Sequence, residues 1–232
     1  MKSLPAGYRA LVLGSTGAIG AALVAQLRTD PRCAAVHTLA RNTTPPLDFY
    51  DPSSVIRAAD SLRTRGPWHL ILVATGMLQG PTGTPEKRMA DLSAEHLAAS
   101  FAVNTIGPAM ALAHFAPQLA RGGRCHFAVL SAKVGSIGDN RLGGWLSYRA
   151  SKAALNMVIK TAAIEMARTH PQAVLVALHP GTVNSALSAP FRGAQIGRPA
   201  NDAAGEILAV LDRLQPEDSG GLWAYNGQRL PW

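Results

Sequence analysis

The chain has 232 residues, 47% of them hydrophobic, which suits one large core and predicts a single domain over residues 1–232. Its formal net charge is +8, but the basic residues are scattered without a stripe or an aromatic-interleaved patch, which argues against nucleic acid as a partner. Cys33 and Cys125 are far apart and lack metal-ligand spacing, so we expect no disulfide framework, no metal site and a reducing, cytoplasmic location.

Short β-rich runs alternate with longer helical runs along the chain. The first half contains the strands "YRALVLG", "AAVHTLA" and "HLILVAT", with helices from about Ala18 to Arg28 and near Ser53 to Arg65. The second half contains a long helix from about Ser93 to Leu119, disturbed at Gly107-Pro108, then "RCHFAVLS", a helix with Tyr148 and Lys152, "AVLVALHP", a helix near Asp202 to Leu214, and "GLWAYN".

The alternation predicts an α/β Rossmann fold, a doubly wound parallel sheet of about seven strands with helices on both faces. We expect long loops at 76–85 and 185–200, because such folds keep their sites in loops at the carboxyl ends of strands. No run reaches the roughly 18 unbroken apolar residues of a membrane span, so no membrane association is expected.

The first strand leads into a glycine-rich turn, "GSTGAIG", formed by Gly14, Ser15, Thr16, Gly17, Ala18, Ile19 and Gly20. Such a turn needs residues that tolerate positive φ, and a backbone without Cβ atoms lets a pyrophosphate approach the helix N-terminus, where free amide hydrogens point at it. Its place between the first strand and a helix predicts a dinucleotide site. The alternative is a tight strand-to-helix turn that holds no ligand.

The segment after the second strand, "TLARN", bears on the choice of cofactor. It places Arg41 where the adenosine ribose of a dinucleotide would lie, and no Asp or Glu at the strand end can accept the 2′-hydroxyl. A guanidinium grips a 2′-phosphate through two hydrogen bonds, so we predict NADP (NADPH) in preference to NAD. Taken alone, Arg41 is more typical of a surface residue, and the absent carboxylate is what favours NADP.

Tyr148 and Lys152 in "WLSYRASKAALN" are four residues apart, one turn of a helix. Most pairs at this spacing are ordinary neighbours, but this helix follows a strand whose carboxyl end faces the same crevice as the glycine turn. A tyrosine hydroxyl titrates near 10 when unperturbed, and an adjacent ammonium lowers that pKa by favouring the phenolate. We therefore predict that Tyr148 transfers a proton, and that Lys152 tunes it and holds the nicotinamide ribose.

The chain resembles a short-chain dehydrogenase/reductase over essentially its whole length, and its second half resembles the small bacterial C-factor-like branch of that superfamily. The segments that carry the resemblance are "GSTGAIG", "NTIGPAMALAHFAPQL", "SAKVGSIGDNRLGGWLSYRASKAALN", "HPGTV" and "GGLWAYNGQRLPW". The motif "YRASK" is weak by itself, but it is specific in company with the others, in order and correctly spaced.

The resemblance implies a role for each matching residue. Tyr148 would be the general acid or base, Lys152 would bind the ribose, and Asn104 would anchor a water that links Lys152 to solvent. Without the resemblance, Asn104 reads as a polar residue that caps the helix kink before Gly107-Pro108. The remaining implied cofactor contacts are Pro180, Gly181, Thr182 and Val183 near the nicotinamide, Asp48 and Phe49 near the adenine, and Ala74, Thr75 and Gly76 after the third strand.

Three departures from the family pattern limit this transfer. Ala18 stands where the family has its middle glycine and Gly17 lies one place earlier, a spacing met in the extended branch. Ala74-Thr75-Gly76 replaces the usual "NAG" and so lacks the asparagine that steadies the sheet. Ala132 stands where the family has its serine, so we expect the neighbouring Ser131 to turn into the crevice through a one-residue bulge and bind the substrate oxygen. The alternative is a regular strand end, which would point Ser131 away.

The sequence thus predicts an NADP-dependent oxidoreductase that transfers hydride between the cofactor and a carbonyl or alcohol substrate. Two alternatives remain, a dinucleotide-binding regulatory or signalling protein with weak turnover and an epimerase- or dehydratase-like enzyme. The expected partners are a small-molecule substrate and further copies of the chain, in a homodimer or homotetramer. Apolar residues suggest the walls of a substrate pocket: Leu78, Val134, Leu142, Trp145 and the segment 185–200.

Overall fold

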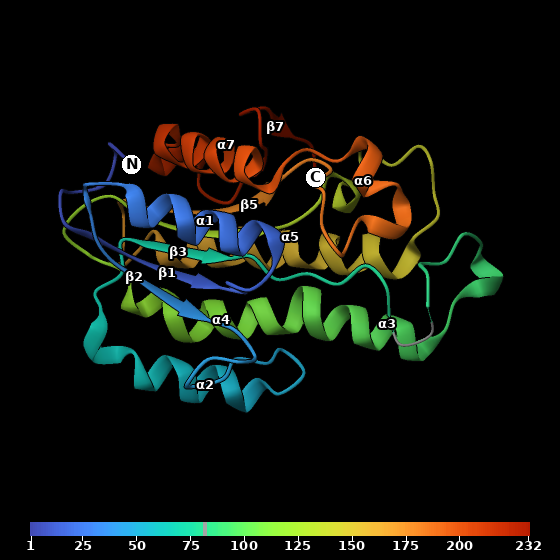
Figure 1. Ribbon diagram of the computed structural model, residues 1–232, viewed down its shortest axis with the longest axis horizontal. Coiled ribbons are helices and arrows are strands. Elements are labelled where there is room, and N and C mark those ends of the chain that lie inside the picture. The colour runs from blue at the N-terminus through green and yellow to red at the C-terminus, as the bar shows by residue number, and fades with distance from the viewer. Residues whose placement is uncertain (81–82) are drawn as a thin grey trace.

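The computed structural model, which describes residues 1–80 and 83–232, contains one seven-stranded sheet (Figure 1). The strand order is β2-β1-β3-β4-β5-β6-β7, and all neighbours are parallel except the antiparallel pair β6 and β7. The strands are β1 Tyr8–Leu13, β2 Cys33–Leu39, β3 Leu70–Val73, β4 Cys125–Leu130, β5 Ala173–His179, β6 Leu222–Ala224 and β7 Arg229–Leu230. The predicted α/β fold is confirmed, while the short β7 was not predicted.

Helices cover both faces of the sheet, as Figure 1 shows. One face carries α1 and α7, and the other carries α2, α4 and α5, each face with its own apolar core. The helices are α1 Ala18–Thr29, α2 Pro52–Ser61, α3 Ala94–Phe101, α4 Gly107–Phe115, α5 Leu146–Met166, α6 Gly193–Ile196 and α7 Ala200–Arg213. Because the central strands are covered on both sides, every residue of β3 and β4 is buried.

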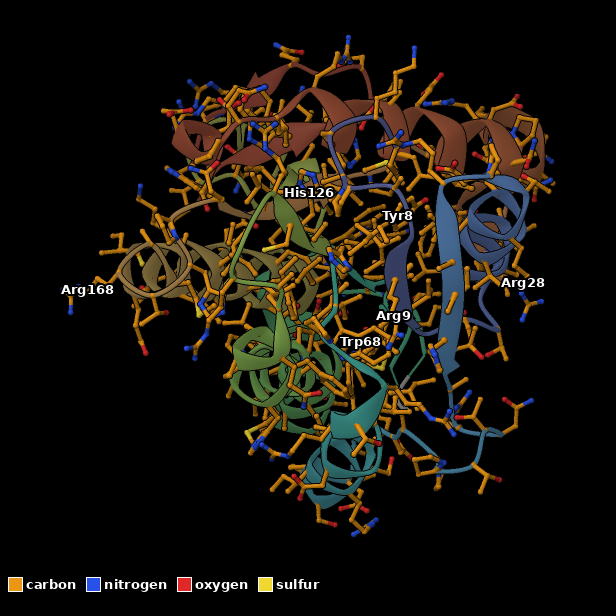
Figure 2. The ribbon with its side chains drawn as sticks, turned by 90° about the vertical axis from the view of Figure 1, so that its left-hand side faces the viewer. Tyr8, Arg9, Arg28, Trp68, His126 and Arg168 are labelled. Atoms are coloured by element: carbon orange, nitrogen blue, oxygen red, sulfur yellow. The ribbon has the colours of Figure 1, made fainter. Side chains whose placement is uncertain are left out.

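The two ends of the parallel strands differ in what they can hold. Figure 2 views the amino-terminal end, where Tyr8, Trp68 and His126 are fully buried among the layers and Arg28 and Arg168 reach outward. At the opposite end, β2 and β3 lie on either side of β1, because the chain passes from β1 to β2 on one side and then crosses back to β3 on the other. A crevice opens where the strand order reverses in this way.

The long helix predicted from Ser93 to Leu119 is divided by a π-helical turn at Ala102–Ile106, between α3 and α4. Pro108 has no N–H to donate to the carbonyl of Asn104. The Gly107 N–H bonds to the Ala102 carbonyl, five residues earlier, which is the π-helical pattern. The disturbance thus begins before the predicted Gly107-Pro108 step. Such turns often mark functional sites.

Two further segments differ from the sequence expectations. The predicted loop 185–200 contains α6 and a 3-10 turn at Ala189–Phe191, and part of the predicted loop 76–85, residues 81–82, lies outside the described residues. Among the described residues, Ala94–Gln118 is long and apolar enough to cross a membrane by length and composition, and 50% of its most apolar window is buried inside the protein. That burial is typical of a core helix.

Candidate active site

A cavity of about 480 Å³ lies at the carboxyl ends of β1, β2 and β3. The loops after these strands build it, together with one residue of the π-helical turn. Its lining residues are Gly14, Thr16, Gly17, Ala40, Arg41, Leu47, Asp48, Phe49, Tyr50, Ala74, Thr75, Gly76, Met77 and Val103. The glycine turn, the segment around Arg41 and the segment after β3 therefore meet at one place.

Each of the three glycines in the turn is suited to its position for a different physical reason. Gly14 has φ +82°, and a Cβ there would lie 2.8 Å from the Thr75 methyl. A Cβ on Gly20 would lie 2.1 Å from the Gly14 carbonyl oxygen, so Gly20 is required by the close packing of α1 on the turn. A Cβ on Gly17 would meet the same oxygen at 3.6 Å, an ordinary contact, and it would enter the cavity. The absence of a side chain at Gly17 thus leaves space for a ligand in the cavity, whereas contacts within the protein do not require glycine there.

The cavity fits a dinucleotide in two further respects. Gly17 is the N-cap of α1 and offers no side-chain cap, so the first amide groups of the helix are available to a pyrophosphate. The Thr75 hydroxyl is buried, has no hydrogen-bond partner and belongs to a cavity-lining residue. An unpaired buried hydroxyl is costly, and a bound ligand would satisfy it.

Other predicted cofactor residues stand outside this lining. Ser15 donates a hydrogen bond from its hydroxyl to the Leu39 carbonyl, and Ala18, Ile19 and Gly20 belong to α1. Pro180 to Val183 follow β5, where Gly181 has φ +77° and a Cβ on it would strike the Tyr225 ring at 2.9 Å. The lining residues that were not predicted are Ala40, Leu47, Tyr50, Met77 and Val103. Nothing in the local sequence indicates, for example, that the Tyr50 hydroxyl contacts the Met77 sulfur at 3.1 Å.

Tyr148 and Lys152 lie in the first two turns of α5, and both side chains are buried. The Lys152 ammonium donates to the Leu130 carbonyl at 2.8 Å and lies 5.9 Å from the centre of the Tyr148 ring. A Cβ on Gly76 would be 3.9 Å from the Lys152 Nζ. The cavity lining at Gly76 therefore lies close to the Lys152 ammonium.

The two pKa values move in opposite directions, and burial is the cause of both. Burial raises the pKa of Tyr148 to about 12 and lowers the pKa of Lys152 to about 7. The expected lowering of the Tyr148 pKa by Lys152 is not seen, and burial of the phenol is the cause of the upward shift. At neutral pH, Tyr148 is therefore a protonated phenol.

Asn104 is fully buried in the π-helical turn and clamps the segment after β3. Its amide donates to the Met77 carbonyl at 2.8 Å and to the Ser151 hydroxyl at 3.1 Å, while its carbonyl oxygen accepts from the Met77 N–H at 2.8 Å. Thr105 adds a 2.7 Å bond to the Ser151 carbonyl. The π-helical turn thus ties the cavity wall to α5, and Asn104 does not cap the kink.

The structure corrects the expectation for Ser131. Its hydroxyl donates to the Asn156 carbonyl oxygen at 2.7 Å, and both residues are buried. Ala132 instead packs in one apolar cluster with Tyr148 and Leu78. The chain leaves β4 in a regular extended conformation, with Ala132 at φ −149° and ψ 146°, so the two side chains alternate and Ser131 faces away from Tyr148.

The apolar cluster around Tyr148 contains most of the predicted pocket walls. Val134, Trp145, Leu187 and Phe191 pack against its buried members, and the last two come from the segment 185–200. Leu142 does not join it, because its side chain is 93% exposed. Within the described residues, no group of three or more His, Cys, Asp or Glu side chains is placed to hold a metal ion.

Comparison with protein families gives a direct match. A family model described as short chain dehydrogenase matches residues 20–195. The chain is 33% identical over 145 residues to the C-signal of Myxococcus xanthus, in an alignment that covers 62% of this chain and 83% of that protein. It is 35% identical over 130 residues to 1-hydroxy-2-glutathionyl-2-methyl-3-butene dehydrogenase of a Rhodococcus species, of which the match spans 56%.

Solved structures share the fold over nearly the whole chain. The NADPH-bound carbonyl reductase from chicken fatty liver superposes with a TM-score of 0.82 at 24% sequence identity, covering 99% of this chain and 100% of that one. At this identity the likeness shows a common fold.

Proposed function

The chain belongs to the short-chain dehydrogenase family of oxidoreductases, and on that premise we propose that it transfers hydride between NADP(H) and a carbonyl or alcohol substrate. One observation carries the proposal: a buried Tyr148 and Lys152 stand beside a cavity built by a glycine turn at the carboxyl ends of three strands. The name of the carbonyl reductase that shares the fold supports the same reaction class.

A dinucleotide held in the cavity would supply the hydride. Tyr148 donates its hydroxyl proton to the substrate oxygen, and at neutral pH the proton is present because the phenol titrates far above pH 7. Proton transfer is favourable despite the raised pKa, since an alkoxide that forms on the substrate is far more basic than a phenolate. In the direction of alcohol oxidation, Tyr148 must first lose its proton, which favours higher pH.

Lys152 and Asn104 support this transfer from the side of the cofactor cavity. Lys152 is anchored through the Leu130 carbonyl and retains donors for the ribose hydroxyls beside Gly76. Asn104 holds the backbone of Met77 through two hydrogen bonds and so fixes the wall next to Gly76. In this proposal, a water anchored near Asn104 relays protons to Lys152.

The preference for NADP over NAD rests on Arg41. This residue is exposed and lines the cavity together with Thr16 of the glycine turn. No carboxylate follows β2 directly to accept a ribose diol, and a guanidinium suits the 2′-phosphate.

The rest of the proposal concerns the setting of the enzyme. We place the protein in the cytoplasm as one domain over residues 1–232, acting on a small molecule. We also propose a homodimer or homotetramer, supported by Met157 and Ile164 of α5, which are 66% and 56% exposed. Size-exclusion chromatography with light scattering tests the assembly.

A second candidate function is a dinucleotide-binding signalling protein with weak turnover. Ala132 in place of a serine favours it, because Tyr148 then lacks a neighbouring hydroxyl to share the substrate oxygen. The name of the relative from Myxococcus xanthus, C-signal, points the same way. NADPH oxidation across a panel of aldehydes, ketones and quinones separates the two, since tight NADPH binding without turnover would identify the signalling protein.

The reductase proposal is tested by Tyr148→Phe, which removes the proton donor and little binding surface. General acid catalysis contributes about a hundred- to ten-thousand-fold, so we expect turnover to fall by at least a hundredfold while the Kd for NADPH stays within about threefold. Single-turnover kinetics with NADPH measure the chemical step. A variant that keeps more than a tenth of the wild-type rate would contradict the role of Tyr148.

A further inference from the structure

The backbone just before α5 is held in an unusual conformation. Gly143, Gly144 and Trp145 have consecutive positive φ values of 64°, 65° and 53°. Glycine adopts this left-handed conformation freely, whereas a bulky side chain pays a steric penalty. A strained residue persists only where its surroundings impose the conformation, and such residues gather at functional sites.

Glu86 imposes the conformation from a segment about sixty residues earlier in the chain. Its backbone carbonyl accepts the Trp145 N–H at 2.5 Å. Its buried carboxylate accepts the Ser147 N–H at 3.2 Å and also a hydrogen bond from the Ser147 hydroxyl. Glu86 therefore holds the chain on both sides of the Trp145 side chain and caps the first turn of the helix that carries Tyr148.

Glu86 holds this position as a carboxylate. Burial opposes its ionisation, but the hydrogen bonds from Ser147, with smaller contributions from the Glu86 backbone N–H and from His96, together hold the pKa of the Glu86 carboxyl below its usual range. The positive end of the α5 dipole at Ser147 also favours the charge. A charged acceptor makes the stronger hydrogen bonds that a strained backbone needs.

The conformation directs the Trp145 indole toward Tyr148. The two ring centres are 6.4 Å apart and the ring planes form an angle of 72°. The indole also packs against the Phe191 ring, with ring centres 5.0 Å apart and an angle of 61° between the planes. The other members of this cluster are Leu78, Ala132, Val134 and Leu187, all of them uncharged. An uncharged apolar group is therefore the substituent that suits the side of Tyr148 covered by this cluster.

Resting on the carbonyl reduction proposed above, we propose that Trp145 selects the substrate and that Glu86 is the positioning residue for it. The indole is the surface on which an aromatic group next to the reacting carbonyl packs, edge to face, as Phe191 does in this structure. The substrate class is therefore aryl aldehydes and ketones rather than small polar carbonyl compounds.

The first test compares benzaldehyde with propanal as substrates of the full-length enzyme with NADPH. We expect a higher kcat/KM for benzaldehyde in the wild type. Trp145→Asn should reduce the ratio of the two kcat/KM values about tenfold, mainly through a higher KM for benzaldehyde. Asn is chosen because it tolerates the left-handed conformation while removing the ring. Trp145→Phe, which keeps a ring, should reduce the ratio less.

The second test addresses Glu86 through the same ratio. Glu86→Gln keeps one acceptor oxygen and should lower the ratio partially, whereas Glu86→Ala should lower it as far as Trp145→Asn does. Ser147→Ala removes one of the two carboxylate contacts and gives an independent measurement if the Glu86 variants fail to fold. The matched control is Glu165→Gln, the same substitution at an exposed position of α5, and it should leave the ratio at its wild-type value.

The outcomes separate this inference from the proposed function. If the wild type turns over both probes and the ratio is the same in Trp145→Asn, the inference is wrong and the reductase proposal stands. A wild-type preference for propanal overturns the inference as well. If the wild type oxidises NADPH with neither probe, the inference fails, and the panel of aldehydes, ketones and quinones decides the proposed function separately.

Discussion

The glycine turn offers a prediction in which the same substitution at two positions has two different effects, one on stability and one on cofactor binding. Gly20→Ala would place a methyl 2.1 Å from the Gly14 carbonyl oxygen and 3.2 Å from the Ser15 Cα, all of it backbone that must shift. Overpacking of this kind costs about 1–3 kcal/mol, and a chain of this size loses about 2–4 °C of Tm per kcal/mol. We therefore expect Gly20→Ala to lower the Tm by about 2–12 °C.

Gly17→Ala should instead spare the fold and damage the cofactor site. Gly17 has φ −72° and ψ 160°, which any residue adopts, and the new methyl would meet the Gly14 oxygen at 3.6 Å. We expect a change in Tm of about 2 °C or less. The methyl enters the cavity, and the loss of one charge-assisted hydrogen bond to the pyrophosphate, about 1.5–3 kcal/mol, should raise the Kd for NADPH by about 10- to 100-fold.

Calorimetric titration of NADPH and a thermal melt of the two variants and the wild type test both halves. An unchanged Kd in Gly17→Ala would show that the dinucleotide does not lie against the turn. Equal losses of Tm in the two variants would refute the steric assignment of Gly17 and Gly20.

Three further predictions follow from single residues. Arg41→Ala should raise the apparent KM for NADPH about tenfold or more and leave that for NADH little changed; equal use of both cofactors by the wild type would refute its role. Ser131→Ala should lower the free energy of unfolding by about 1–3 kcal/mol by leaving the buried Asn156 oxygen unpaired, with kcat within about threefold, and a large loss of kcat at unchanged Tm would return Ser131 to the substrate site. Burial lowers the pKa values of His126 and His179 from 6.5 to about 4, so the unfolded chain takes up protons first as the pH falls. The free energy of unfolding should therefore decline between pH 6.5 and about pH 4, by about 3 kcal/mol for each histidine. Urea unfolding that is independent of pH over this window would contradict the prediction.

The sequence by itself determined the fold class and the place of the cofactor cavity. Continuous apolar strands separated by helices require a parallel sheet buried on both faces, and a glycine turn after the first strand lies at the carboxyl edge of such a sheet. Gly14, Arg41 and Thr75, which are far apart in the chain, line one cavity for that reason. The spacing of Tyr148 and Lys152 likewise follows from the helical repeat, which is a local property.

Only the tertiary structure decided how the side chains around Tyr148 are arranged and charged. The sequence leaves open whether Ser131 turns into the crevice at the place that Ala132 occupies. The regular extended exit from β4 and the hydrogen bond to Asn156 of α5 turn Ser131 away. The direction of the Tyr148 pKa depends on desolvation by residues that converge from several loops, which no local motif encodes. The contact between Glu86 and Ser147 spans 61 positions, and its partners are matched by packing rather than by spacing.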